Sequence, residues 1–360
     1  MLQRLVGASG NCRWASSTSR LRHAWLHPSR ASLSSKEVLD LDIQGHQKQR
    51  ATPSPFSILI VGDGNFSYSN AVATAFQDAK ADVHIVATSL DTRDELDEMY
   101  PTAAAAIAAL DAKDVRVVHG INARSLAGHK EALGHAASFD RIVFNFPHFA
   151  EDGNTRNKIS KHRELLADFF VSCRAVLAPH GQIWLALCAG QGGTPAETTV
   201  VRSAGDTWQV VPCAAAGRFL LLDVHPFPYA ALSRLGYHSV GYRLEERAFH
   251  SEDGLVHVFG HEAATQARFA QTWSRNVSMW LGPKFTQNAM EAAFREVLGP
   301  GVTIEFTQED EYTCAKTARR SLMFRVDVES RVHNFTRQRL TDYIRIVGAK
   351  LEQDGVAVIR

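Results

Sequence analysis

The feature that most constrains this chain is a strand, a glycine turn and a helix within residues 56–69, FSILIVGDGNFSYS. The apolar run Ile58 to Val61 predicts a buried strand, and a helix is expected from Ser67 to Ala79. Gly62 and Gly64 allow a close approach of the backbone to a ligand and positive φ angles. Doubly wound α/β domains hold nucleotide-like cofactors at such turns, but here the third glycine of the dinucleotide fingerprint is a serine. The stretch alone fits both a ligand loop and an ordinary tight turn.

Strand-like and helix-like segments alternate from this point as far as residue 190. The further strands are expected at Val83–Thr88, Val115–Val118, the run from Phe139, Gln182–Leu187, Arg218–Val224 and Val256–Phe259. A long amphipathic helix is expected from about Ile159 to Leu177, where Pro179 stops it. The pattern predicts an α/β fold with a Rossmann-like sheet. It fits a methyltransferase better than a dehydrogenase, which more often repeats the mononucleotide unit.

Polar residues follow three of these strands. Asp91 comes after the second strand, where a carboxylate can bind ribose hydroxyls or cap the helix expected from Thr92. Asn122 comes after the third, where it can meet an adenine edge or be a plain loop residue. The tetrad Asn145 to His148, with sequence NFPH, closes the fourth. Ligands of open α/β sheets bind at the carboxyl ends of strands, so these residues are candidates for one site.

The first 36 residues differ in composition from the rest of the chain. They contain five arginines and eight serines but no Asp or Glu, which is the composition of a mitochondrial transit peptide. We therefore expect residues 1–36 to direct the protein to the mitochondrial matrix; the alternative is a basic tail of a nuclear or cytosolic protein. Residues 37–55 are polar and end in prolines, as expected of a linker.

The overall composition excludes some classes of protein. With 45% hydrophobic and 21% charged residues it is typical of a globular protein, and no apolar run approaches the roughly 20 residues of a membrane span. The five cysteines form no C-x-x-C pair, which argues against a structural zinc site and for a reducing compartment. A net charge of +1 means that any RNA-binding surface must be local. We expect neither a metal nor a membrane partner.

The C-terminal hundred residues predict a second domain. Strands are expected at Arg275–Leu281, Val302–Thr307, Ser321–Val328 and Val356–Ile359, and helices at Phe285–Leu298 and Thr336–Gln353. The resulting order, βαββαβ, is that of a ferredoxin-like α+β domain. We therefore expect a Rossmann-like domain over residues 56–262 and a ferredoxin-like domain over residues 263–360.

Four motifs in consistent order carry a resemblance to a known family. They are GDGNFSYS (62–69), ATSLD (87–91), FDRIVFNFPH (139–148) and the segment 163–195, which ends in LCAGQGGTP. Together they resemble the ribosomal RNA uridine-N3 methyltransferase-like family, whose members carry a GEGNFSFS-like loop, an ATSYD-like segment and an NFPH motif. The C-terminal segment from ARRSLMFRVDV to VAVIR resembles the ferredoxin-fold anticodon-binding domain of some phenylalanyl-tRNA synthetases. The chain is similar to a branch of the family in which the two are fused.

The resemblance implies S-adenosyl-L-methionine as the cofactor and the N3 atom of a ribosomal RNA uridine as the methyl acceptor. The residues implied in cofactor binding are Gly62, Asp63, Gly64, Asn65, Phe66, Ser67, Asp91 and Asn122. The residues implied in catalysis are Asn145, Pro147 and His148, placed to hold the target base. The Asn145 amide can both donate to and accept from a uracil edge.

The N3 proton of uridine must leave, and two residues are candidates for taking it. Histidine titrates near neutral pH, so His148 can be the base, or it can be a structural residue after a proline. Asp63 is an alternative acid/base group. Phe146 and Phe149 flank the tetrad, where they can stack on a splayed base or pack in the core.

Departures from the family pattern keep other functions open. Asn122 stands where the family usually has an acid, and the loop 188–195 lacks the lysine typical of the uridine methyltransferases. A methyltransferase-like RNA-binding or ribosome-assembly protein without catalysis is therefore one alternative. A tRNA-binding module built on the C-terminal domain is another.

A basic cluster in the C-terminal domain is the candidate RNA-binding surface. Its residues are Lys316, Arg319, Arg320, Arg325 and Arg337. Such a patch can contact phosphates, although Asp327 and Glu329 dilute it and a solvated charged face is the alternative. We expect RNA as the partner, ribosomal RNA rather than transfer RNA.

Overall fold

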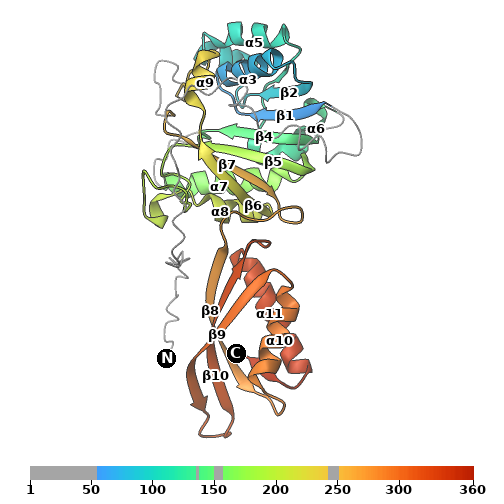
Figure 1. The fold of residues 1–360 in the computed structure, drawn as a ribbon, viewed down its shortest axis with the longest axis vertical. Coiled ribbons are helices and arrows are strands. Elements are labelled where there is room, and N and C mark those ends of the chain that lie inside the picture. Colours follow the sequence, from blue (N-terminus) through green and yellow to red (C-terminus); the bar gives the residue numbers. More distant parts are fainter. Residues whose placement is uncertain (1–54, 135–137, 150–156, 242–250) are drawn as a thin grey trace. The chain divides into compact units, whose positions relative to one another are not determined.

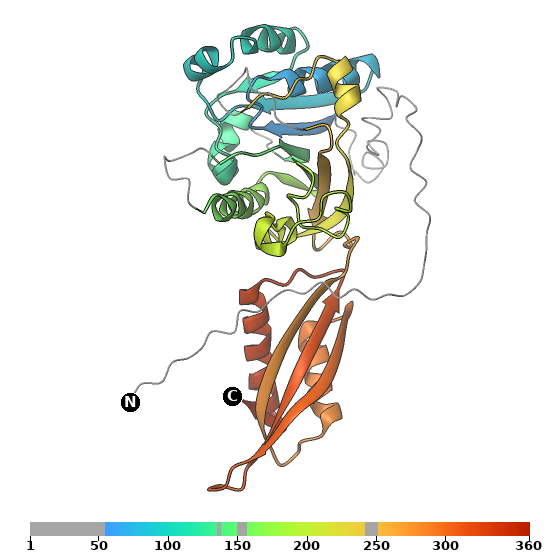
Figure 2. The same cartoon turned by 90° about the vertical axis from the view of Figure 1, so that its left-hand side faces the viewer.

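A computed structural model describes residues 55–134, 138–149, 157–241 and 251–360 (Figures 1 and 2). The transit peptide predicted for residues 1–36 and nearly all of the predicted linker lie outside these ranges. The described chain divides into two compact units at Arg268 and Phe269, six residues beyond the boundary expected from the sequence. None of the described helices is long and apolar enough to cross a membrane.

The first unit is built on a seven-stranded sheet (Figure 1). Its strands are β1 (Phe56–Val61), β2 (Val83–Thr88), β3 (Arg116–Val118), β4 (Phe139–Asn145), β5 (Leu177–Leu187), β6 (Phe219–Pro226) and β7 (Leu255–His261). They lie in the order β3-β2-β1-β4-β5-β7-β6, where the first five are parallel and β7 is antiparallel to both neighbours. This confirms the Rossmann-like class. The strand order reverses between β1 and β4, and such a switch point is where open sheets bind ligands.

Helices cover both faces of this sheet. The unit contains α3 (Ser67–Asp78), α4 (Arg93–Met99), α5 (Ala103–Asp111), α6 (Lys130–Leu133), α7 (Lys158–Cys173), α8 (Val210–Ala216), α9 (Tyr229–Arg234) and the 3₁₀ segments η1 (Ala123–His129) and η2 (Ala204–Asp206). One core joins α3, α5 and α9 to the sheet through Phe76, Leu110 and Leu232. On α7, Phe169 packs against Phe144 of β4 and Phe170 against Phe259 of β7.

The helix expected to end at Leu177 ends at Cys173 instead. Leu177 already belongs to β5, where it pairs with Phe139 of β4, so strand pairing replaces the last helical turn. Pro179 could not continue a helix, and here it lies near the start of the strand. Helical periodicity alone did not reveal this boundary, because Val176 and Leu177 are apolar and buried although they lie outside the helix.

The second unit is the predicted βαββαβ domain. It contains β8 (Gln271–Leu281), α10 (Gln287–Leu298), β9 (Val302–Thr313), β10 (Arg320–Ser330), α11 (Arg337–Gln353) and β11 (Ala357–Ile359). The strands form an antiparallel sheet in the order β11-β8-β10-β9, which confirms the ferredoxin-like class. Thr286 and Thr336 cap the two helices by accepting from Ala289 N and Arg339 N. Both helices pack on one face of the sheet through Phe294, Val347 and their neighbours (Figure 2).

Candidate functional site

The glycine turn leaves β1 at the switch point, and its two glycines are tightly enclosed. Gly62 has φ +66°, and a Cβ atom there would lie 3.1 Å from the ring of Phe144. A Cβ atom on Gly64 would lie 3.2 Å from the ring of Tyr100. Asp63 N donates to Thr88 O at 2.9 Å, which ties the turn to the end of β2. At Gly62 the backbone is thus held in a conformation that glycine adopts more easily than other residues.

Asp63 turns its carboxylate toward the start of α3. It accepts hydrogen bonds from Ser69 N at 2.7 Å and from Ser69 Oγ at 2.5 Å. Burial raises the pKa of Asp63, while the bonds from Ser69 act in the opposite direction. Because both bonds go to the same oxygen of this carboxylate, its local role is to fix the helix start.

Three residues after Gly64 that are predicted to bind the cofactor, Asn65, Phe66 and Ser67, turn their side chains inward. Asn65 Oδ1 accepts from Ser67 N at 3.1 Å and Ser67 Oγ at 2.8 Å, and its Nδ2 lies 2.9 Å from His238 Nε2. Ser67 Oγ also lies 3.0 Å from His238 O. Phe66 is fully buried and meets the ring of His119 edge-on, with centroids 5.7 Å apart. These side chains shape the turn, which leaves its backbone to face a ligand.

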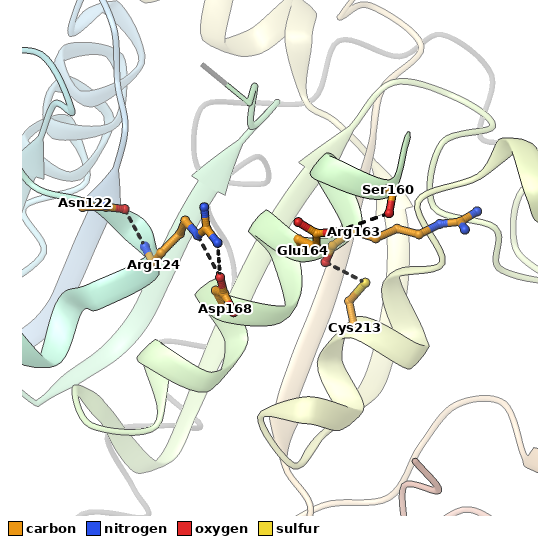
Figure 3. A network of polar contacts seen from close by, with 7 residues as sticks. All are labelled: Asn122, Arg124, Ser160, Arg163, Glu164, Asp168 and Cys213. Atoms are coloured by element: carbon orange, nitrogen blue, oxygen red, sulfur yellow. Dashed lines mark hydrogen bonds and ion pairs between the residues drawn. The ribbon is translucent and has the colours of Figure 1, made fainter. Parts of the chain in front are cut away.

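Asp91 and Asn122 lie at the ends of neighbouring strands, as expected, but in different environments. Asp91 is buried at 4% exposure, and its carbonyl accepts from Ser89 Oγ at 2.8 Å. The cap of α4 is Thr92, in a capping box with Glu95, so the alternative cap role for Asp91 is wrong. Asn122 is exposed and caps η1, with Oδ1 accepting from Arg124 N at 2.9 Å (Figure 3).

Arg124, which follows Asn122, reaches across to α7. Its Nε and Nη2 donate to Asp168 Oδ2 at 2.8 and 2.5 Å (Figure 3). Neither side chain is buried, with exposures of 41% and 47%. The Arg124 side chain therefore joins η1 to α7.

The tetrad that closes β4 contains a buried donor without a partner. Asn145 Nδ2 is buried and has no hydrogen-bond partner among the described residues. Buried polar groups are nearly always paired, so such an atom at a switch point is suited to a ligand. Phe146 follows in a left-handed conformation, φ +46°, which turns the chain sharply. Pro147 is then buried and His148 exposed.

Aromatic side chains gather beside this tetrad, and most of them were not predicted from the sequence. Phe227, between β6 and α9, lies 4.9 Å from Phe146, 6.3 Å from Tyr68 and 5.7 Å from Tyr237, measured between ring centroids. Tyr229 packs on Tyr237 at 5.9 Å. Phe227 and Tyr237 lie in the segments 225–228 (HPFP) and 236–237 (GY), and nothing in either segment indicates which strand end it joins.

Tyr68 is the member of this aromatic group that lies beside the Asn145 amide. Burial raises the pKa of Tyr68 to about 12, and the Asn145 side chain near its hydroxyl opposes the rise. Tyr68 and the Asn145 amide do not form a hydrogen bond, because no described acceptor lies at the required distance and angle from Asn145 Nδ2. Tyr68 is therefore a polar neighbour of the donor and leaves it free for a ligand.

His148 is supported by a second histidine from α7. The rings of His148 and His162 lie 5.5 Å apart edge to face, and His162 stacks on Trp208 at 4.3 Å. His162 Nδ1 lies 2.7 Å from Lys158 O, and Nε2 accepts from Phe149 N at 3.4 Å. This pairing makes Nδ1 the protonated nitrogen of a neutral ring. Burial lowers the pKa of His162, and the nearby His148 contributes in the same direction.

The glycine-rich loop after β5 is explained by packing. A Cβ atom on Gly192 would clash with His257, and one on Gly193 would clash with Thr207. The buried Glu197 accepts from Gly192 N at 2.8 Å and from Thr194 N at 2.7 Å. Among the described residues no cluster of His, Cys, Asp and Glu could hold a metal ion.

A Rossmann-like sheet with a glycine turn, an acid after β2 and a polar tetrad after β4 defines a methyltransferase domain of the class I type. The family model described as rRNA (uridine-N3-)-methyltransferase BTM5-like matches residues 59–241, half of the chain. The chain therefore belongs to this family of rRNA methyltransferases, and the resemblance stated from the sequence is confirmed.

Two curated relatives are named for a ferredoxin-fold anticodon-binding domain. The chain is 38% identical over 206 residues to the human ferredoxin-fold anticodon-binding domain-containing protein 1, an alignment that covers 57% of this chain and 31% of that protein. The mouse homolog is 40% identical over 205 residues, with the same coverage. The matched segment thus spans less than a third of the length of these relatives.

Solved structures of low similarity were also found. TrmN from Thermus thermophilus has a TM-score of 0.33 and 16% identity, covering 64% of this chain and 50% of its own. The 16S rRNA methyltransferase KamB has a TM-score of 0.31 and 18% identity, covering 60% of this chain and 92% of its own. Likeness at this level adds nothing to the assignment, which stands on the family match and the strand order.

Proposed function

We propose that this protein uses S-adenosyl-L-methionine to methylate the N3 atom of a uridine in mitochondrial ribosomal RNA. The observation that carries the proposal is the unpaired, buried Nδ2 of Asn145 at the switch point. It lies at the end of the strand next to the glycine turn, where an α/β domain binds its ligands. The family match supplies the reaction class.

The residues around the turn fit the cofactor. The backbone of Gly62 and Gly64 would admit its methionine part, Asp91 would hold the ribose hydroxyls, and Asn122 would meet the adenine. The strand ends of β2 and β3 bring the last two together: Ile121 N donates to Ser89 O at 2.9 Å. When bound, S-adenosyl-L-methionine supplies an electrophilic methyl group on sulfur.

The tetrad would hold and activate the base. Asn145 Nδ2 donates to a carbonyl oxygen of uracil, a bond that satisfies the orphaned donor and fixes the edge of the base. His148 is exposed at this strand end and takes the N3 proton, leaving the nitrogen lone pair free to react. The contact with neutral His162 places the His148 ring without adding a positive charge that would hinder protonation.

Binding and transfer can be tested separately on the full chain. Calorimetry should show S-adenosyl-L-methionine binding that Asp91→Ala weakens by tenfold or more, about 1.4 kcal/mol. Transfer of a labelled methyl group to mitochondrial ribosomal RNA should stop in His148→Ala while cofactor binding persists. Nucleoside analysis of the product identifies the methylated atom, and 3-methyluridine is expected. Cofactor binding without any RNA methylation would rule out the enzyme.

One observation favours a second candidate, an RNA-binding assembly protein without catalysis. Asn122 replaces the acid of the family pattern and uses its side-chain oxygen to cap η1. If adenine recognition is lost with that acid, calorimetry finds no cofactor affinity while RNA binding remains. Crosslinking followed by sequencing of the bound RNA then distinguishes ribosomal from transfer RNA.

The matrix location is also a proposal, supported by the acid-free, arginine-rich composition of residues 1–36. Fusion of these residues to a fluorescent protein should carry it into mitochondria. A fusion with the five arginines replaced by glutamine should stay outside, and import of that variant would contradict the proposal.

A further inference from the structure

The four-stranded sheet of the second unit has one face that its own helices leave uncovered. Both α10 and α11 pack on the other face, through residues such as Val277 and Phe324 (Figure 2). On the uncovered face, cross-strand pairing places four residues in one row across β11, β8, β10 and β9: Val358, Trp280, Ser321 and Tyr312. Tyr312 is 50% exposed and Val358 is 36% exposed. The rings of Trp280 and Tyr312 lie 6.1 Å apart.

Two arginines bring positive charge to this row. The guanidinium carbon of Arg319 lies 5.1 Å from the centroid of Trp280, and that of Arg360 lies 4.7 Å from it. Arg360 is anchored by its backbone N, which donates to Ser278 O at 2.8 Å. Within residues 251–360 no side-chain carboxylate forms an ion pair with either arginine. Arg360 Nη1 donates to Oγ of the buried Ser321 at 3.5 Å, a neutral partner, so the positive charges of both arginines are not cancelled and can attract a phosphate.

The remaining arginines predicted to bind RNA differ in their partners. Arg320 pairs with Glu311 at 2.6 Å. Arg325 pairs with Glu309 at 3.3 Å and with Asp327 at 3.0 Å. Arg337 opens α11, on the helical side of the sheet. Within the described part of this unit, Arg319 is therefore the predicted arginine that combines an unpaired charge with an aromatic neighbour.

We infer that this row, with Arg319 and Arg360, forms a stacking platform that binds an unpaired base of the RNA substrate and its phosphates. The inference deepens the proposed function and rests on it. Bases of single strands stack on exposed aromatic rings, whereas bases within a duplex are stacked on one another and cannot. Tyr312 offers the open ring, and Trp280 holds the guanidinium groups of Arg319 and Arg360, whose planar faces can themselves stack on a base. The two guanidinium groups reach the phosphates that flank the base.

The test measures binding of the full chain to a fluorescein-labelled, uridine-rich 12-mer RNA by anisotropy, beside a duplex of the same length. Tyr312→Ala and Trp280→Ala should each weaken single-strand binding at least about fivefold, and Trp280→Phe should retain most of it. Arg319→Ala should weaken binding and lower the salt dependence by about one counterion. Arg295→Ala is the matched control, since it removes the same charge from a position on α10 that is paired with Glu291, and it should change the affinity less than about twofold.

Two readouts keep the outcomes distinct. Melting temperature identifies a variant that fails to fold, and Tyr312→Ala tests the platform at an exposed position if Trp280→Ala is unstable. Calorimetric binding of S-adenosyl-L-methionine should be unchanged in all of these variants. Wild-type affinity of both alanine variants overturns the platform, whatever the methylation result. An intact platform in a chain that binds no cofactor overturns only the proposed methyltransferase.

Discussion

The two candidate ligand surfaces of this protein are built in opposite ways. At the switch point of the first unit, polar groups are buried, and the decisive atom, Asn145 Nδ2, lacks a partner among the described residues. On the sheet face of the second unit, aromatic and cationic groups are exposed, and cross-strand register sets their spacing. The first arrangement depends on loops that converge from distant parts of the sequence. The second depends only on neighbouring strands of one sheet.

This difference predicts how each surface responds to single substitutions. An unpaired buried donor raises the free energy of the protein, and a ligand that accepts its hydrogen bond gains affinity. Single substitutions there should therefore affect the chemistry strongly. An exposed stacking surface shares its binding energy among several residues, so single substitutions should have graded effects on affinity.

The largest expected effect is that of Asn145→Ala on methyl transfer. Loss of the donor that fixes the base should reduce kcat by about 100-fold or more, because a reacting group held in place by one hydrogen bond becomes poorly oriented. Single-turnover methyl transfer with saturating cofactor measures it. Trp280→Ala, in contrast, should raise KM for RNA and leave single-turnover kcat nearly unchanged. If the two substitutions change the same parameter, the division between a reactive and a binding surface is wrong.

The second prediction compares Gly62→Ala with Gly120→Ala, to distinguish backbone strain from close packing at the glycine turn. Gly62 and Gly120 both have positive φ, +66° and +70°, but an added Cβ atom would have a neighbour within 4 Å only at Gly62. Gly120→Ala should cost about 1 kcal/mol of unfolding free energy from the conformation alone. Gly62→Ala adds overlap with the Phe144 ring and should cost more, with a loss of cofactor affinity that Gly120→Ala does not show. Urea unfolding and calorimetry measure both, and equal results would remove close approach as the reason for Gly62.

A third effect is sensitivity of the first unit to acid. Burial lowers the pKa of five of its histidines: His119, His162, His225, His257 and His261. His257 falls furthest, from 6.5 to about 4, and it lies against Gly192. The unfolded chain binds these protons near pH 6.5 and the folded unit only at lower pH, so protons favour unfolding. The neutral histidines therefore contribute fully to the free energy of unfolding above pH 6.5. This contribution declines toward pH 4, by up to about 1.4 kcal/mol per pH unit for His257.

Hydrogen exchange at pH 7 and pH 5 measures this decline in each unit. Amides of β5 and β7 should lose protection at pH 5, and His257→Asn should make their protection less dependent on pH. A variant with the wild-type pH dependence would show that His257 is not the group responsible.

The smallest expected effect is at the ion pair between Arg124 and Asp168. Both side chains are more than 40% exposed, so water and salt screen the attraction. Arg124→Ala should cost less than about 1 kcal/mol of unfolding free energy, and a double-mutant cycle with Asp168→Asn measures the coupling. If Arg124→Ala instead abolishes cofactor binding, Arg124 belongs to the site and not only to the packing of η1.

The secondary structure and the positions of the site motifs could be predicted from local sequence patterns. Alternating apolar runs and helical periods located every strand of both sheets, because burial on a sheet imposes a repeat that one segment shows by itself. The glycine turn, Asp91 and the NFPH tetrad were placed at carboxyl strand ends because each motif directly follows its strand. The ferredoxin-like order was predicted for the same reason.

The tertiary structure decided which groups are free. Asn65 and Ser67, both predicted to bind the cofactor, contact His238, which lies more than 170 positions away in the sequence. Arg319 and Arg325 look alike in the sequence, yet one lies against Trp280 and the other against two carboxylates. Hydrogen bonds and ion pairs between distant segments depend on atomic positions that only the packed fold fixes, so the sequence determined the scaffold and the fold determined the chemistry it leaves exposed.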